Sequence, residues 1–174
     1  MTQSSGGEGF VVRLQKMRKL GFGGVLLDIS VALLLSTALP AGAQDTIKIG
    51  FFAPITGPAA ADGMSAKHAV ELGLREVNDA GGIKGKKVEL IIYDDRLKAE
   101  EAVAIANKLI EKDKVVGVVS GSYSGPTRVT APIFQKAGMP MVAGYAVHPD
   151  VTWDSKQKKP NDFIFRNGFL GEVE

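Results

Sequence analysis

From residue 46 onward, short apolar runs alternate with longer segments in which apolar residues recur every three or four positions. The short runs are rich in β-branched and aromatic residues and predict strands: TIKIGFFA (46–53), KVELIIY (87–93), VVGVV (115–119), MPMVA (139–143) and FIFR (163–166). The longer segments predict amphipathic helices that begin near residues 63, 98 and 124. Strands that alternate with helices indicate an α/β fold with a parallel sheet.

The alternation also predicts the order of the strands. Right-handed crossovers place helices on both faces of a doubly wound parallel sheet, for which we expect the order 2-1-3-4-5. In that order the winding direction changes between strands 1 and 3, and ligands bind at such a switch point, beyond the carboxyl ends of the strands. The loops expected at this crevice are 56–63, 120–127 and 145–148, whereas the Lys-rich segment 153–162 is expected to be an exposed loop.

Residues 1–43 have the three-part pattern of a secretory signal peptide. A basic stretch, RLQKMRK (13–19), precedes the largely apolar segment 25–39, and the small residues AGA (41–43) fit a cleavage site. Asp28 and nearby glycines leave the apolar run too short for a membrane-spanning helix, which requires about 20 residues. We therefore expect a cleavable signal, with Met17 as an alternative start of the chain.

The composition of the chain excludes several kinds of functional site. A chain of 174 residues with 45% hydrophobic content suggests one domain with a sizeable core. The net charge of +2 gives no indication of nucleic-acid binding. The absence of cysteine excludes disulfides, thiolate metal sites, a cysteine nucleophile and a lipid-modified cysteine. We expect neither a cofactor nor a metal ion.

Enzymatic interpretations find little support in the motifs. The segment GPAAADG (57–63) lacks both nucleotide-loop spacings, although backbone donors there could hold an anion or the phosphate of FMN. Asp94 and Asp95 could bind magnesium, but a turn whose carboxylates meet water or cap the next helix explains them more simply. No GxSxG elbow surrounds the serines near residue 122, so a hydrolase is weakly supported.

Binding of a small molecule requires fewer special features than catalysis does from the residues of the crevice loops. We expect Ser124 to cap the helix that follows it, where its hydroxyl and free backbone N–H groups suit a carboxylate. Tyr123 and Tyr145 can supply flat walls with a polar edge, and Asp62 can accept from an ammonium or hydroxyl group. Capping, packing or solvation would explain each residue singly, but their convergence on one crevice favours binding.

Two long runs resemble a known family. The segments DTIKIGFFAPITGPAAADGMSAKHAVELGLREVNDAGGIKGKKVELIIYDDR and VVGVVSGSYSGPTRVTAPIFQKAGMPMV are similar to type I periplasmic binding proteins. Within them, the chain most resembles the branched-chain amino acid (leucine/isoleucine/valine) class of ABC-transporter receptors. The resemblance covers residues 45–174 and implies a non-catalytic, periplasmic protein that holds its ligand between two α/β lobes and delivers it to a membrane permease.

The resemblance also implies roles for single residues. Ser124 matches the serine that binds the ligand's carboxylate, and Thr127 lies one helical turn further along the chain. Asp62 occupies a position where an aromatic residue often covers the ligand. The first lobe of the family grips the α-carboxylate and the α-amine, so these positions predict one half of an amino acid site.

The loop after the fourth strand completes that half-site. Tyr145, Ala146 and Val147 match the loop where backbone groups and a threonine hydroxyl commonly meet the ammonium, but Val147 has no hydroxyl. Together with Asp62, this departure leaves other amino acids, short amides and small carboxylic acids open as ligands.

Family members of this class are about twice as long as residues 44–174, so this region corresponds to an N-terminal lobe and the C-terminal lobe is missing. We expect the single lobe to bind ligand weakly, because closure of two lobes supplies the remaining contacts. Two alternatives remain: a ligand-sensing regulator built on the same lobes, and a single-domain flavodoxin-like protein that binds FMN.

Overall fold

The computed structural model of the chain describes residues 46–168 and 170–171. Contacts within the chain divide it into two units, Met1–Ala43 and Gln44–Glu174. The predicted signal peptide coincides with the first unit and lies outside the described residues. Among the helices of the described part, none has the length and apolarity needed to cross a membrane.

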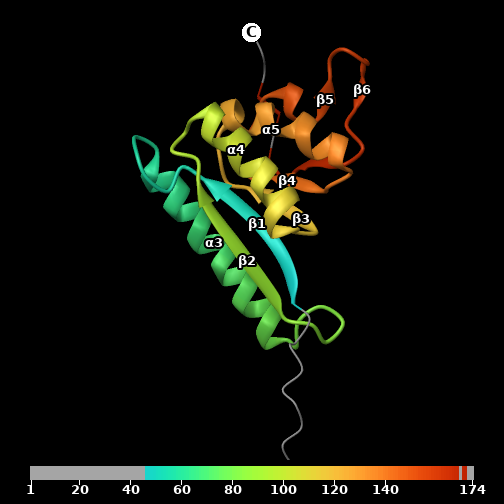
Figure 1. Cartoon of the computed structure of the whole chain (residues 1–174). Helices are drawn as coiled ribbons and strands as arrows, with labels where there is room; N and C mark the ends of the chain where they lie inside the picture. Colours follow the sequence, from blue (N-terminus) through green and yellow to red (C-terminus); the bar gives the residue numbers. More distant parts are fainter. Residues whose placement is uncertain (1–45, 169, 172–174) are drawn as a thin grey trace, which may run out of the picture. The chain divides into compact units, whose positions relative to one another are not determined.

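One parallel sheet organises the second unit (Figure 1). Its strands follow the order β2-β1-β3-β4-β7, which confirms the predicted order because β7 is the fifth strand of the sheet along the chain. The strands are β1 (Ile47–Ala53), β2 (Val88–Asp94), β3 (Gly117–Ser120), β4 (Met141–Ala143) and β7 (Ile164–Arg166).

The helices connect successive strands, as predicted. They are α3 (Ala60–Asp79), α4 (Ala99–Lys108), the π-helix η1 (Leu109–Asp113), α5 (Ser124–Ala137) and the 3₁₀ turn η2 (Pro149–Val151). The prediction that the first helix begins at residue 63 was wrong, because the chain already turns helical at Ala60, and only residues 54–59 form the loop. The predicted end of α5 at Gly138 is confirmed by its left-handed backbone, with φ of 64°.

The Lys-rich segment 153–162 is not a simple loop. It contains an antiparallel hairpin of two short strands, β5 (Trp153–Asp154) and β6 (Lys159–Pro160). Asp154 accepts hydrogen bonds from the backbone N–H groups of Lys156 and Gln157, which shapes the turn between the strands. The predicted exposure is correct, since every residue from 155 to 160 is exposed.

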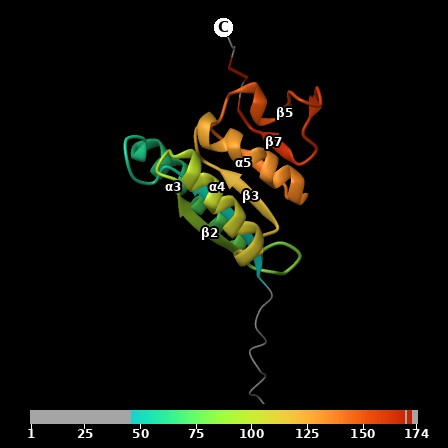
Figure 2. The same cartoon turned by 45° about the horizontal axis from the view of Figure 1, so that its top comes forward.

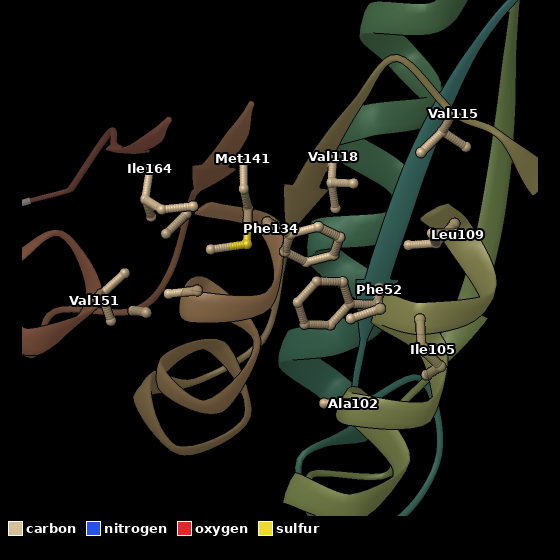
Figure 3. Close-up of a cluster of buried hydrophobic side chains, with 14 residues drawn as sticks. Phe52, Ala102, Ile105, Leu109, Val115, Val118, Phe134, Met141, Val151 and Ile164 are labelled. Atoms are coloured by element: carbon tan, nitrogen blue, oxygen red, sulfur yellow. The ribbon is translucent and has the colours of Figure 1, made fainter. Parts of the chain in front are cut away.

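The core lies between the sheet and the pair of helices α4 and α5 (Figure 3). Phe52 of β1 and Phe134 of α5 are fully buried and stack with ring centroids 6.4 Å apart. Side chains from neighbouring strands and from η1 extend this cluster: Leu109, Val118, Met141 and Ile164 are all at least 97% buried. These residues alternate along each strand with others that face the opposite side.

The opposite face of the sheet is covered only in part. Here α3 packs over β1 and β2 (Figure 1), and Phe51 is 99% buried. In the same cross-strand row, Val119 is partly exposed, Val142 is 38% exposed and Phe165 is 51% exposed. An apolar surface therefore lies open over β3, β4 and β7.

Gly63 fixes the start of α3 against the end of β1. A Cβ at this position would lie 2.1 Å from the carbonyl oxygen of Pro54, which is backbone and cannot rotate away. Within the same helix, a Cβ at Gly73 would meet no atom within 4 Å.

We predict opposite effects of alanine at these two glycines. Gly63→Ala should lower the free energy of unfolding by about 2 kcal/mol or more, because α3 must move away from Pro54. Gly73→Ala should raise it by about 1 kcal/mol, because alanine is the better helix former. Urea unfolding measures both values, and equal effects of the two substitutions would contradict the packing of α3 against Pro54.

Candidate functional site

Three of the predicted site residues meet at the carboxyl ends of the strands. Asp62 lies in the first turn of α3, Tyr123 precedes α5, and Tyr145 follows β4. The Tyr123 hydroxyl donates a hydrogen bond to the Asp62 carboxylate, and the two tyrosine rings meet edge to face with centroids 4.9 Å apart. The hydrogen bond to Asp62, followed by the interaction with Tyr145, raises the pKa of Tyr123 well above its usual value.

Ser124 does not cap α5, contrary to our expectation. The N-cap position is held by Tyr123 without a side-chain hydrogen bond, and Ser124 is the first helical residue. Its Oγ accepts hydrogen bonds from the backbone N–H groups of Val147 and His148, each at 3.2 Å. The hydroxyl therefore ties the start of α5 to the loop after β4, where Ala146 is buried and Val147 is partly exposed.

Thr127 lies beneath the loop between β3 and α5 and is fully buried. Its hydroxyl donates to the carbonyl of Ser122 and accepts from the hydroxyl of Ser120, 2.8 Å away. The Ser122 N–H donates in turn to the Ser120 Oγ, which closes a ring of three hydrogen bonds. This ring, which sequence reasoning missed, fixes the backbone immediately before Tyr123 and Ser124.

A cavity of about 380 Å³ opens beside these residues, on the α3 side of the sheet. Asp62 and Tyr145 line it together with apolar side chains of α3, β1 and β3: Ala66, Ala69, Val70, Phe51 and Val119. The helical period of α3 signalled that its alanines and Val70 share one face, but only the structure shows that this face borders a cavity.

Asp94 holds the loop between β1 and α3. Its carboxylate accepts from the backbone N–H groups of Ile55, Thr56 and Arg96 and from the Thr56 hydroxyl. Burial alone would raise the pKa of Asp94, but the hydrogen bonds from Thr56, Arg96 and Ile55 together lower it. The turn interpretation of the two aspartates is therefore correct for Asp94.

Asp95 is fully buried at the start of the α4 connection. Its Oδ1 accepts from the N–H of Leu97, whereas its Oδ2, like the buried Oγ of Ser122, has no hydrogen-bond partner in the described part of the chain. Burial raises the pKa of Asp95, and the nearby Ser122 hydroxyl and the Leu97 N–H oppose the rise.

The acidic and histidine side chains of the described residues bear on the metal and hydrolase interpretations. Within 46–168 and 170–171, no group of three or more His, Asp or Glu side chains could hold a metal ion. His68 is exposed on α3, and Nδ1 of His148 accepts from the N–H of Asp150 rather than from a serine. The arrangement can instead hold a small polar molecule by hydrogen bonds.

Comparison with protein families gives one match to this region. Residues 46–171 match the family described as periplasmic binding protein. A relative from Pseudomonas aeruginosa, the leucine-, isoleucine-, valine-, threonine- and alanine-binding protein, is 36% identical over 110 residues, covering 63% of this chain and 29% of its own length. The Leu/Ile/Val-binding protein BraC3 of Rhizobium johnstonii is 35% identical over 73% of this chain and 34% of its own length.

Solved structures agree with these relatives. The branched-chain amino acid transporter substrate-binding protein LivJ of Streptococcus pneumoniae, in complex with isoleucine, matches with a TM-score of 0.66 and 32% identity, over 72% of this chain and 34% of that structure. A solute-binding protein from Rhodopseudomonas palustris, in complex with 3,4-dihydroxybenzoic acid, matches with a TM-score of 0.62 and 26% identity, over 72% and 32%. The chain thus spans about a third of the length of these proteins.

We predict that Asp95→Asn changes how stability depends on pH. Because the folded-state pKa of Asp95 is raised, its contribution to stability is complete below the ordinary value of 3.8 and is lost as the pH rises through the raised value. Asparagine does not ionise, so the variant does not lose this stability as the pH rises. The free energy of unfolding of the variant minus that of the original chain should therefore be larger at neutral pH than in acid. Urea unfolding across this pH range measures the difference.

The exposed Asp79 at the end of α3 provides the control. Asp79→Asn should leave the pH dependence of unfolding close to that of the original chain. If Asp95→Asn and the original chain had the same pH profile, ionisation of Asp95 would not destabilise the folded state, and the prediction would be wrong.

Proposed function

The chain belongs to the periplasmic binding protein family, and from this premise we propose that it is the N-terminal ligand-binding lobe of an ABC-importer receptor. Its resemblance to the leucine/isoleucine/valine class is confirmed by the relatives, which are named as amino acid-binding proteins. The protein we propose binds a small molecule in the periplasm without transforming it, and passes it to a permease in the inner membrane.

The observation that carries this proposal is the convergence of polar groups at the switch point between β1 and β3. The start of α5 offers backbone N–H groups to a carboxylate, close to Ser124 and the loop at residues 145–147. Asp62 offers a negative charge to an ammonium or hydroxyl group, and Tyr123 and Tyr145 flank it with aromatic surface. This combination suits a ligand that carries a carboxylate and a hydrogen-bond donor.

The ligand we propose is an amino acid, a short amide or a small carboxylic acid. Val147 brings no hydroxyl to the loop after β4, and Asp62 adds a charge where the family resemblance implies an aromatic cover. Asp62 therefore makes the site more polar at the start of α3, and Val147 makes it less polar at the loop after β4. In this proposal Thr127 does not contact the ligand, because its hydroxyl is hydrogen-bonded within the buried ring. It positions the backbone that precedes Tyr123 and Ser124.

The open face of the sheet is consistent with our proposal that the receptor has a second lobe. Val142 and Phe165 present apolar surface over β4 and β7 that a larger protein would bury. The relatives are about three times as long as the matched region, more than the factor of two that the family resemblance implied, and this length supports the same view. We therefore assign residues 44–174 to one lobe, whose partner lobe completes the ligand site.

Residues 1–43 fit this proposal as a signal peptide that directs the receptor to the periplasm. The two alternative functions find less support. The reported relatives and structures are transport receptors, which favour neither a regulator nor an FMN-binding flavodoxin-like protein.

We predict that a form of the chain extended by the C-terminal part of a Leu/Ile/Val-binding relative gains thermal stability with its ligand. A panel of amino acids, short amides and small aromatic acids should contain a ligand that raises the melting temperature, because binding to the folded state alone stabilises it. The unextended chain should respond much less, since it supplies only half of the contacts. No response from either form across the panel would contradict the receptor function.

Two variants of α3 locate the binding site in the same assay. Asp62→Asn should weaken binding of a responding amino acid about tenfold or more, because a hydrogen bond to a charged group is worth about 1.5–3 kcal/mol. Asp79→Asn removes the same charge from the exposed far end of the helix and should leave binding unchanged. Equal losses in both variants would indicate a general charge effect instead of a contact with Asp62.

A further inference from the structure

A second hollow lies on the outer side of α5, away from the ligand crevice. It is a groove of about 610 Å³ between α5 and the β5–β6 hairpin, which stands beside that helix (Figure 2). Arg128, Pro132 and Lys136 of α5 form one wall, and Trp153 and Lys156 of the hairpin form the other. We call this hollow the basic groove.

Hydrogen bonds from the side chains of Gln135 and Arg166 hold the walls of the basic groove in place. Gln135 of α5 donates to the Asp162 carboxylate and accepts from the N–H of Phe163, so the end of the hairpin segment is fixed to the helix. Arg166 of β7 donates to the carbonyls of Val147 and His148 and to the Thr152 hydroxyl, so the segment before β5 is fixed as well. The groove therefore exists before any partner binds.

The charges in the basic groove are unevenly matched. Three cations line it against two acids: Asp154, which accepts from the N–H groups of Lys156 and Gln157, and Asp150, which accepts from the Ser155 hydroxyl. The three cations Arg128, Lys136 and Lys156 are exposed and form no ion pair within the described part of the chain. Lys158 and Lys159 add further positive charge at the hairpin.

An apolar surface lies between these cations. Trp153 is 43% exposed, and Pro132 on the opposite wall is exposed too. Exposed tryptophan and arginine side chains, here Trp153 and Arg128, are enriched at the centre of protein interfaces.

We propose that the basic groove binds an extended acidic segment of a partner protein. Arg128, Pro132 and Lys136 follow one another at intervals of four residues on one face of α5. The two cations are thus separated by eight residues of helix, about 12 Å along its axis. In an extended segment, two acids four positions apart lie on the same face and are about 13 Å apart. The residue midway between them faces the same way, toward Pro132 and Trp153.

The partner segment therefore carries an acid, an apolar residue and a second acid at every second position. A flat anionic membrane fits less well, because the cations line the two walls of a groove and do not share one flat face. This inference concerns a partner protein and not the transported ligand, so it stands or fails independently of the receptor's ligand site.

Trp153 makes the test direct, because it is the only tryptophan of the chain. The probe is a short unstructured peptide with two glutamates four positions apart and a leucine midway, compared with a peptide in which both glutamates are glutamine. Added to the purified chain, the glutamate peptide should shift Trp153 emission to shorter wavelength in a saturable way. The glutamine peptide should bind about tenfold more weakly or not at all.

Charge-reversed variants separate the basic groove from general charge effects. The double variant Arg128→Glu with Lys136→Glu should abolish the response to the glutamate peptide. Its matched control, Arg75→Glu with Lys112→Glu, changes the net charge equally at exposed positions outside the groove and should keep the response. Circular dichroism verifies that both double variants are folded.

Three outcomes would overturn the proposal. The first is an absence of any Trp153 response to the glutamate peptide, and the second is an equal loss of response in the two double variants. The third is a response to vesicles of anionic phospholipid without one to the peptide, which would assign the surface to a membrane. Raising the salt from about 0.05 to 0.3 M should weaken peptide binding, because exposed charges are then screened.

Discussion

The pairing of β1 with β2 on one side and β3 on the other determines where the candidate ligand site lies. Because the connections from β1 and β3 leave the sheet on opposite faces, through α3 and α5, their loops separate above the strands and leave a crevice. Two adjacent residues of β1 point to opposite faces of the sheet. Phe52 packs into the core under α5, and Phe51 packs beneath α3. The same strand thus joins the core to the candidate site.

The crevice is shaped by hydrogen bonds that exist without a ligand. The ring formed by Ser120, Ser122 and Thr127 fixes the backbone before α5, and the Ser124 hydroxyl joins the helix to the loop after β4. Asp94 holds the third loop at the end of β1. In the proposed receptor, such preorganisation would reduce the entropy that a ligand must offset when it binds, and the second lobe would shield the ligand from water.

Local patterns predicted the strands, their order and the end of α5, because these depend on hydrophobic period, turn residues and the handedness of crossovers. They did not predict the contacts of Ser124 and Thr127, which depend on how segments distant in sequence come together. A serine before a helix resembles a cap, and only the position of the loop at Val147 and His148 shows that its hydroxyl is used elsewhere. The β5–β6 hairpin escaped prediction because its strands are two residues long.

We propose that the crevice at Asp62, Ser124 and Tyr145 forms one half of a ligand site. A crystal structure of the protein extended to two lobes, with a bound ligand identified by thermal shift, tests it most directly. We expect the ligand's carboxylate to lie at the start of α5 within hydrogen-bond distance of Ser124 or its neighbouring N–H groups, with the second lobe covering its other side. A ligand bound away from all three residues would contradict the assignment of this crevice as the ligand site.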